Sequence, residues 1–219
     1  MTDIRCCVCE SSMQNREAEW CYRCPQCRTW GSTLSVGINR ESLHGGLDEA
    51  LREEGLAELR RDNLAMVTDR LIELGLRPAA RVLDVGSAHG WFLKAATARG
   101  LDAEGIEPDQ AVAAMPGSGR VRVGYFPDIL GPDEHFDAIT FNDVLEHLPD
   151  ADAAVAASLR HLRSGGLLSI NIPNSDGLFF RLARLCRRIG LRSAFDRLWQ
   201  VGLPSPHLWY FNADGLDRL

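Results

Sequence analysis

The stretch that decides the fold lies between Arg81 and Leu93 and reads RVLDVGSAHGWFL. An apolar strand passes through Asp84 into a glycine turn at Gly86, and a helix follows. About twenty residues further on, a second predicted strand ends in Glu107. A nucleoside that lies across the carboxyl ends of two parallel strands needs these features: glycines where the backbone approaches the ligand, and a carboxylate for the ribose hydroxyls. The stretch therefore predicts a nucleoside site in a parallel sheet.

The glycine spacing separates the classes of nucleoside ligand. A dinucleotide fingerprint places glycines in a G-x-G-x-x-G row so that the helix N-terminus can hold a pyrophosphate. Counted from Gly86, that row falls on Ala88 and Trp91, and the indole would fill the space that a pyrophosphate needs. No Gly-Lys-Ser/Thr follows the turn, as a P-loop requires. An acidic strand end beside a turn without a phosphate cradle suits a ligand that carries an ammonium and a sulfonium.

At these residues the chain resembles the class I S-adenosylmethionine (SAM)-dependent methyltransferases. Their first motif reads roughly (D/E)-x-G-x-G-x-G, which Asp84, Gly86 and Gly90 match, with Ala88 in place of the middle glycine. The resemblance continues in the family's order through a fourth strand and its exit loop, the turn into a fifth strand, and two substrate-side loops, at 136–148, 162–170, 172–174 and 206–211. It implies an α/β, Rossmann-like fold with helices on both faces of a parallel sheet. SAM would be the cofactor and S-adenosylhomocysteine (SAH) the product.

The resemblance also implies roles for individual residues. Asp84 would support the methionine end of SAM, and Gly86, Ala88 and Gly90 would let the chain pass close to it. Glu107 would accept from the two ribose hydroxyls, a bidentate role suited to a carboxylate. The residues expected to border the adenine or the reaction centre are Tyr125, Phe126, Asp128 and Asn142. The aromatic residues after the third strand have a simpler alternative, since aromatics there are often plain core.

Two histidines are candidates for a general base. An imidazole with an unperturbed pKa of about 6.5 suits proton removal from a hydroxyl or an acidic carbon, which favours His147 at the reaction centre. An equally favoured alternative is that Glu146-His147-Leu148 begins a helix and that the imidazole of His147 only orders the loop. His207 lies next to Trp209 and could close over the acceptor. The loop that begins at Asn142 lacks the Asn-Pro-Pro-Tyr sequence that signals methylation of exocyclic or amide nitrogen, which disfavours such acceptors.

Six of the seven cysteines fall within the first 27 residues. Cys6-x-x-Cys9 and Cys24-x-x-Cys27 each place two thiolates on one tight turn, and a hairpin between them would close a tetrahedral four-sulfur site for structural Zn²⁺. So small a segment has little core, so the metal would supply most of its folding energy. The alternative is a set of buried or redox-active cysteines.

The register of this zinc site has an alternative. Cys21-x-x-Cys24 also fits as the second knuckle, and Cys7 is a spare thiol. Pro25 favours the Cys24–Cys27 pair, because proline forms the turn of a knuckle. A ribbon of this kind can brace its neighbour, cover a substrate or bind nucleic acid, and the mixed charges of the segment favour the first two roles.

Three parts are predicted along the chain. Residues 1–40 form a zinc-ribbon-like segment with four cysteine ligands, residues 41–77 a helical linker or lid, and residues 78–219 the SAM-binding methyltransferase domain. From residue 81 onward strands alternate with helices, the pattern of a parallel sheet. The antiparallel hairpin that usually ends the family's sheet is missing from this sequence.

Two segments show helical periodicity outside this alternation. Apolar residues recur at helical spacing from Asp48 to Leu74, with Gly55 expected to split the run into two helices. From Asp176 to Gln200, arginines alternate with large apolar residues. This second segment predicts an amphipathic lid helix with a solvated basic face, or an acceptor-side surface for a phosphorylated, nucleotide-linked or membrane-associated substrate.

Bulk composition limits the function classes. The 219 residues fit one ordinary domain with a small appendage, and the mean hydropathy of −0.14 is that of a soluble protein. No stretch is long and apolar enough to span a bilayer, and the first residues lack the apolar core of a signal peptide. The cytoplasm is therefore the expected location, where cysteines favour metal or catalysis over disulfides. A formal net charge of −6 argues against wholesale binding to phosphate backbones.

Together these features predict a SAM-dependent methyltransferase that acts by in-line displacement on a small or carrier-linked acceptor. The resemblance favours a sugar, glycan or natural-product hydroxyl or carbon. One alternative is an RNA-modifying methyltransferase whose zinc ribbon binds RNA. Another is a non-catalytic SAM-binding module, in which Ala88 and the missing last hairpin would mark a degenerate site.

Overall fold

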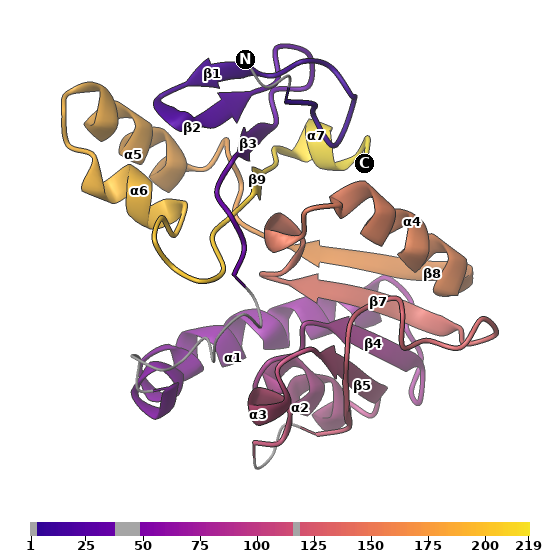
Figure 1. Ribbon diagram of the computed structural model, residues 1–219. Helices are drawn as coiled ribbons and strands as arrows, with labels where there is room; N and C mark the ends of the chain where they lie inside the picture. Colours follow the sequence, from indigo (N-terminus) through magenta and orange to yellow (C-terminus); the bar gives the residue numbers. More distant parts are fainter. Residues whose placement is uncertain (1–3, 38–48, 116–118) are drawn as a thin grey trace. The chain divides into compact units, whose positions relative to one another are not determined.

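The computed structural model describes residues 4–37, 49–115 and 119–219, and the chain divides into two compact units (Figure 1). The unit that we call the ribbon unit consists of Met1–Leu43, Leu145–Val155 and Ile172–Leu219. The unit that we call the sheet unit consists of His44–Val144 and Ala156–Asn171. Each unit is described by itself.

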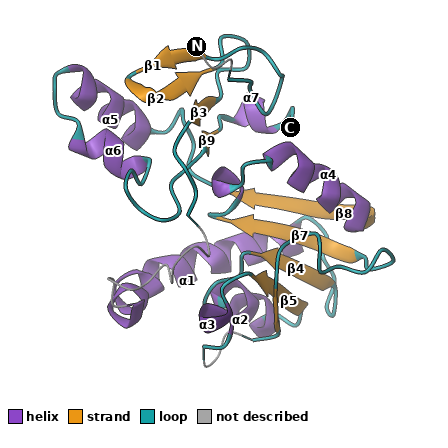
Figure 2. Ribbon diagram, viewed as in Figure 1, coloured by secondary structure: helices purple, strands orange, loops and turns teal. Residues whose placement is uncertain are grey.

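A five-stranded sheet forms the centre of the sheet unit (Figure 2). Its strands are β4 (Arg81–Val85), β5 (Asp102–Glu107), β6 (Val121–Val123), β7 (Phe136–Asn142) and β8 (Leu162–Asn171). They lie in the order β6-β5-β4-β7-β8, and every neighbouring pair is parallel. Strand β4 is buried from Val82 to Val85, as expected of a parallel strand that is covered on both faces. The predicted Rossmann-like α/β fold is confirmed.

Helices of the sheet unit cover this sheet (Figure 2). They are α1 (Glu49–Glu73), α2 (Trp91–Ala98), the short α3 (Gln110–Ala113) and the second half of α4 (Ala151–His161). Helices α1 and α2 pack on one face through a core that includes Leu64, Leu71, Phe92 and Val82. Helix α1 is continuous, so the predicted split at Gly55 is wrong: one glycine costs about 1 kcal/mol, which the helix on either side outweighs.

The order of the strands fixes where a ligand can bind. Strand β4 has β5 on one side and β7 on the other, so the chain reverses its direction of travel across the sheet at β4. In such sheets the crevice lies at the carboxyl ends of the strands beside this switch point. Asp84, Glu107 and Asn142 lie at the carboxyl ends of β4, β5 and β7.

The ribbon unit contains a second, antiparallel sheet of four strands. These are β1 (Gln14–Arg16), β2 (Ala18–Arg23), β3 (Trp30–Ser32) and β9 (Trp209–Tyr210), in that order across the sheet. Trp30 pairs with Tyr210 and Gly31 with Trp209, so segments from opposite ends of the sequence share one sheet (Figure 1). Gly31 allows this approach, because a Cβ there would lie 2.9 Å from Trp209 Cζ3.

The described part of the ribbon unit also contains the 3-10 turn η1 (Leu145–His147), the first half of α4 and three further helices. These helices are α5 (Leu178–Arg188), α6 (Ser193–Leu198) and α7 (Ala213–Leu216). An aromatic core of Trp30, Phe180, Phe195, Trp199 and Tyr210 holds α5 and α6 to the sheet. Asn212 caps α7, as its side-chain oxygen accepts from Gly215 N at 2.7 Å.

The arginines of α5 form a face that is only partly solvated. Arg184 and Arg188 both donate to Glu17, at 2.9 and 3.0 Å, and Arg187 donates to Asp196 at 2.6 Å. Arg181 and Arg188 are exposed, as a solvated basic face requires, whereas their ion pairs hold Arg184 and Arg187 partly buried. Large apolar side chains of the same helix are exposed as well: Leu178, Phe179, Leu182 and Leu185. No helix within the described ranges is both long and apolar enough to cross a membrane.

Candidate functional site

Asp84 is the buried acid of the candidate cofactor site. Its Oδ1 accepts from Thr140 Oγ1 at 2.7 Å and from Asn142 Nδ2 at 2.8 Å, both on the neighbouring strand β7. Burial raises the pKa of Asp84 to about 7, and the nearby negative charge of Glu107 adds to this, while the two hydrogen bonds oppose it. A cationic partner close to this carboxyl would favour its charged form and so lower the pKa again.

The turn after β4 uses the left-handed backbone region three times. Gly86, Ala88 and Gly90 have φ values of 69°, 42° and 66°. An added Cβ at Gly86 would lie only 2.6 Å from Val144 Cγ2, which explains the glycine there. The family's middle glycine is therefore a conformational requirement, and Ala88 meets it at a cost of about 1 kcal/mol.

Glu107 connects two loops at the carboxyl end of β5. Its Oε2 accepts from Ala88 N and its Oε1 from Asp109 N, each at 3.0 Å. Asp109 in turn caps α3 by accepting from Ala111 N and Val112 N. Each oxygen of a carboxylate has a second acceptor position, so the group can bind ribose hydroxyls while it holds both loops. The sequence predicted the ligand role and missed the structural one.

A small cavity of about 40 Å³ lies beside this turn. Asp84, Gly86, Ala88 and Asn142 line it, so the structure brings these predicted residues together. Arg60 of α1 also lines the cavity, with its guanidinium 5.4 Å from the centre of the Trp91 ring. Arg60 was missed, although it lies four residues before the buried Leu64 and so on the same helical face.

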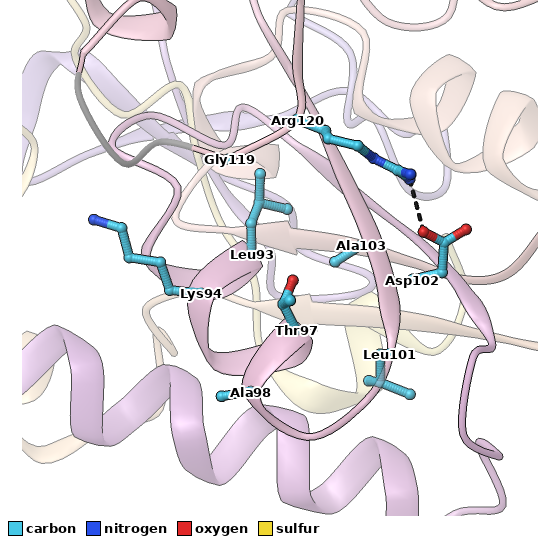
Figure 3. Close-up of a pocket in the computed structure, with 9 residues that line it drawn as sticks. All are labelled: Leu93, Lys94, Thr97, Ala98, Leu101, Asp102, Ala103, Gly119 and Arg120. Carbon is cyan, nitrogen blue, oxygen red and sulfur yellow. Dashed lines mark ion pairs between the residues drawn. The ribbon is translucent and has the colours of Figure 1, made fainter.

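The larger pocket of the sheet unit, about 480 Å³, lies at the opposite end of β5 (Figure 3). It includes the ion pair of Arg120 with Asp102, the first residue of β5, at 2.9 Å. Glu107 ends the same strand. Since ligands of such sheets bind at the carboxyl ends of the strands, the smaller cavity is the candidate cofactor site.

The loop after β6 carries the residues predicted to border the adenine. Phe126 is half-buried and packs edge-on against Phe141 of β7, with ring centres 5.8 Å apart. Asp128 is exposed. Their contact with adenine stays a prediction.

Four thiols meet in the ribbon unit. Sγ of Cys6 lies 3.4 Å from that of Cys27, Sγ of Cys9 lies 3.4 Å from that of Cys24, and all four lie within 4.8 Å of one another. Zn–S bonds of about 2.3 Å place the sulfurs of a tetrahedral site about 3.8 Å apart, so the four residues fit a zinc ion. Cys21 is not part of this group and packs in the aromatic core.

The two knuckles share one backbone feature. Glu10 and Arg28, which follow the second cysteine of each, have φ values of 57° and 66°. Cys6 N donates to Ser11 O and Cys24 N to Thr29 O, which closes each loop. The same fold of the chain is thus repeated on both sides of the thiol cluster.

The two candidate bases lie together in the ribbon unit. The rings of His147 and His207 have centres 4.6 Å apart, and the buried Glu146 is beside them. Burial, and secondarily the neighbouring His147, lowers the pKa of His207 to about 3. The His207 ring is therefore neutral around pH 7.

A Rossmann-like sheet with acidic residues at the ends of adjacent strands and a left-handed turn between them is the architecture of a class I SAM-dependent methyltransferase. The chain belongs to that family: a family described as "Methyltransferase domain" matches residues 56–219.

Curated relatives match a shorter region. The chain is 34% identical over 112 residues to the ubiquinone biosynthesis O-methyltransferase of Alkalilimnicola ehrlichii, which is 47% of this chain and 45% of that protein. It is 31% identical over 124 residues to the enzyme of the same description from Hahella chejuensis, covering 52% of each. The chain thus spans about half the length of the curated relatives it matches.

Solved structures with low identity share the fold. The plantazolicin methyltransferase BpumL in complex with SAH superposes with a TM-score of 0.59 at 11% identity, over 81% of this chain and 70% of that one. A SAM-dependent methyltransferase of Thermotoga maritima gives a TM-score of 0.56 at 18% identity, over 78% and 73%. These likenesses show the fold alone.

Proposed function

We propose that this protein transfers the methyl group of SAM to a small or carrier-linked acceptor. One observation carries the proposal: the carboxylates of Asp84 and Glu107 end adjacent parallel strands, with the left-handed turn at Gly86 between them. A buried acid whose pKa lies near 7 fits the ammonium of the methionine moiety. Glu107 fits the ribose, as its oxygens are already aimed by two backbone amides.

The residues of this chain would act by positioning. SAM supplies an activated methyl group on a sulfonium, so alignment and the exclusion of water can supply much of the rate acceleration. Asp84 would fix the methionine end and Glu107 the ribose, with the methyl group held between these two anchors. We assign the acceptor side to His147 and His207, which the ribbon unit brings together.

We propose a hydroxyl oxygen as the acceptor atom, ahead of a carbon. The curated relatives are described as O-methyltransferases, which supports an oxygen. The loop after Asn142 also lacks the sequence typical of nitrogen acceptors. Sugars, glycans and natural products that carry hydroxyls are the proposed class, and assay of such panels with labelled SAM tests it.

Calorimetric titration with SAH tests the cofactor site before any acceptor is known. Wild-type protein should bind one SAH per chain, and Glu107→Gln should weaken binding about tenfold or more because a charged acceptor is lost. Glu104→Gln is the matched control, since Glu104 lies on the same strand and pairs with Arg81. Equal affinities for all three proteins would remove the ribose assignment.

Turnover separates the enzyme from a non-catalytic module. Methyl transfer to any acceptor of the panel, lost together with SAH binding in Glu107→Gln, supports an enzyme. Tight SAH binding without transfer to any acceptor would favour the binding module.

We further propose that Cys6, Cys9, Cys24 and Cys27 hold one structural Zn²⁺. A zinc ion in such a site contributes about 10–16 kcal/mol of folding energy. Purified protein should contain one zinc ion at this site, and Cys24→Ser should lose it and unfold the hairpin. Cys186→Ser is the control, because Cys186 lies on α5 outside the cluster. A folded, metal-free wild-type protein would contradict the proposal.

No observation favours the RNA-modifying alternative. The arginines of the N-terminal segment make contacts within the protein: Arg16 donates to Gln14, Arg23 lies over Trp30, and Arg28 pairs with Asp214. Salt-dependent RNA binding that is lost in Cys24→Ser would reverse this conclusion.

A further inference from the structure

A buried carboxylate and two imidazoles meet at one point of the ribbon unit. Glu146 and His147 come from η1, and His207 comes from the segment that leads into β9. One oxygen of Glu146 and one ring nitrogen of each histidine lie within 4.8 Å of one another. Glu146 is 1% exposed and His207 6%. One carboxylate oxygen and two imidazole nitrogens, all atom types that bind divalent ions, thus lie in one small buried region.

The backbone holds the two contributing segments together. Leu208 N donates to Glu146 O at 2.7 Å, and Trp209 Nε1 donates to Leu148 O at 3.0 Å. His207 N donates to Trp199 O at 3.1 Å, which ties the segment to the aromatic core. The three side chains are therefore carried by fixed backbone rather than by a free loop.

Each imidazole has one nitrogen within hydrogen-bond distance of a neighbouring group. His147 Nδ1 lies 3.0 Å from Pro206 O and 3.2 Å from Ser205 Oγ, and in the tautomer in which Nδ1–H donates to Pro206 O, Nε2 is the nitrogen that can bind an ion. His207 Nε2 lies 3.0 Å from the side-chain amide of Gln200, and His207 Nδ1 is buried without a hydrogen-bond partner among the described residues. In the structure Gln200 Nε2–H donates to His207 Nε2, and a half-turn of the Gln200 amide would bring its oxygen to the ring, so that Nε2–H donates and Nδ1 is left to bind an ion.

From this geometry we propose that Glu146, His147 and His207 form a second metal site, for a divalent first-row transition ion such as Zn²⁺. Histidine ligands of metals almost always donate their other N–H to a carbonyl, carboxylate or water, as His147 does here. Two imidazoles and a carboxylate are the three protein ligands of a site that leaves a position open.

The distances need only small side-chain rotations. Metal–ligand bonds of about 2.1 Å place the ligand atoms of a tetrahedral site about 3.4 Å apart. In the structure the ligand atoms of Glu146, His147 and His207 lie within 4.8 Å of one another, as do the four sulfurs of the cysteine cluster.

A role for the ion in methyl transfer rests on the function proposed above. The open position would take a hydroxyl or a water molecule, whose pKa a bound cation lowers so that the proton leaves to solvent. His147 and His207 would then be ligands rather than general bases. Metal binding itself needs no turnover, so failure of this proposal is distinguishable from failure of the proposed methyl transfer.

The test is a titration of full-length protein, purified with zinc in its four-cysteine site, with Co²⁺. We expect one additional ion per chain, with the weak visible bands of nitrogen and oxygen ligation and without thiolate charge-transfer bands. Binding should also raise the melting temperature, because the ion binds the folded state. No additional ion, or an ion with thiolate bands that displaces zinc, would overturn the proposal.

Three variants each remove or weaken one of the proposed metal ligands and keep its neighbouring hydrogen bond. His147→Asn keeps a donor for Pro206 O, His207→Gln keeps a partner for Gln200, and Glu146→Gln removes only the charge. Each should weaken Co²⁺ binding roughly tenfold or more. His161→Asn is the matched control: His161 is buried like His207, and its Nδ1 lies 2.9 Å from Glu134 O.

The outcomes remain decisive if a variant folds poorly. Circular dichroism before titration identifies such a variant, and the wild-type stoichiometry and spectrum then decide. Folded variants that bind Co²⁺ as tightly as wild type would place the ion elsewhere and refute the assignment.

Discussion

Replacing Asp84 with asparagine should stabilise the protein and damage its cofactor site. Asp84 Oδ1 accepts both of its hydrogen bonds, from Thr140 and Asn142, and the amide oxygen of Asp84→Asn can accept the same two. The variant therefore removes the charge with little change of shape. In the wild type, burial raises the pKa of Asp84 from 3.8 to about 7. At about 1.36 kcal/mol per pKa unit, this corresponds to about 4 kcal/mol as an upper bound.

The pH range of the effect follows from the direction of the shift. A folded-state pKa above the unfolded value means that Asp84 favours the folded state while protonated. This contribution is complete below pH 3.8 and is lost as the pH rises to about 7. The asparagine variant has no such loss. The difference in unfolding free energy, variant minus wild type, should grow by up to about 4 kcal/mol from pH 4 to pH 7 and then level off.

Urea denaturation at several pH values, with Asp133→Asn as a control for an exposed carboxylate, measures this difference. A flat difference between pH 4 and pH 8 would refute the reasoning, because Asp84 would then be charged throughout.

The same variant should bind SAH about 10- to 100-fold more weakly, since the partner of the ammonium has lost its charge. Wild-type affinity for SAH should rise as the pH passes 7, and the variant should lack this rise. Unchanged SAH affinity in Asp84→Asn would remove the ammonium assignment.

Other substitutions test the turn and the cavity. Without ligand, Glu107→Gln should lower the unfolding free energy by about 2 kcal/mol, because one of two backbone amides loses its acceptor; an unchanged urea midpoint contradicts this. Ala88→Gly should change stability by less than about 1 kcal/mol, as relief of the left-handed strain is offset by the entropy of glycine. A loss of about 2 kcal/mol or more would show that Ala88 packs favourably. Arg60→Met should weaken SAH binding about tenfold, because a cation beside Trp91 balances the carboxylate of the ligand. Equal dissociation constants by calorimetry would exclude Arg60 from the site.

The parallel sheet could be predicted because its signals are local. The strand predicted at 81–85 matches β4 (Arg81–Val85), and the glycine turn after it has the left-handed backbone that the motif requires. The start of β8 was harder. It begins at Leu162, within the segment predicted to form the turn into this strand, because Gly165 at φ 77° lets the strand continue there with a shift of register.

The contacts that could not be predicted join distant parts of the sequence. Strand β9 has only two residues, and its pairing with β3 leaves no periodic pattern in the sequence. The same holds for the salt bridge of Glu17 with Arg184, which leaves one arginine of the predicted solvated face of α5 partly buried. Such contacts depend on the tertiary fold, and a short segment of the sequence carries no signal for them.

The pairing of β3 with β9 also sets an order of events during synthesis. Trp30 leaves the ribosome long before Tyr210, its partner across the sheet. Until then one edge of β3 has no neighbour, and an open edge can pair with another chain. Closing so long a loop is slow compared with forming a hairpin. Nascent chains should therefore be most prone to aggregate late in translation, and a chaperone that covers the N-terminal hairpin should raise the yield.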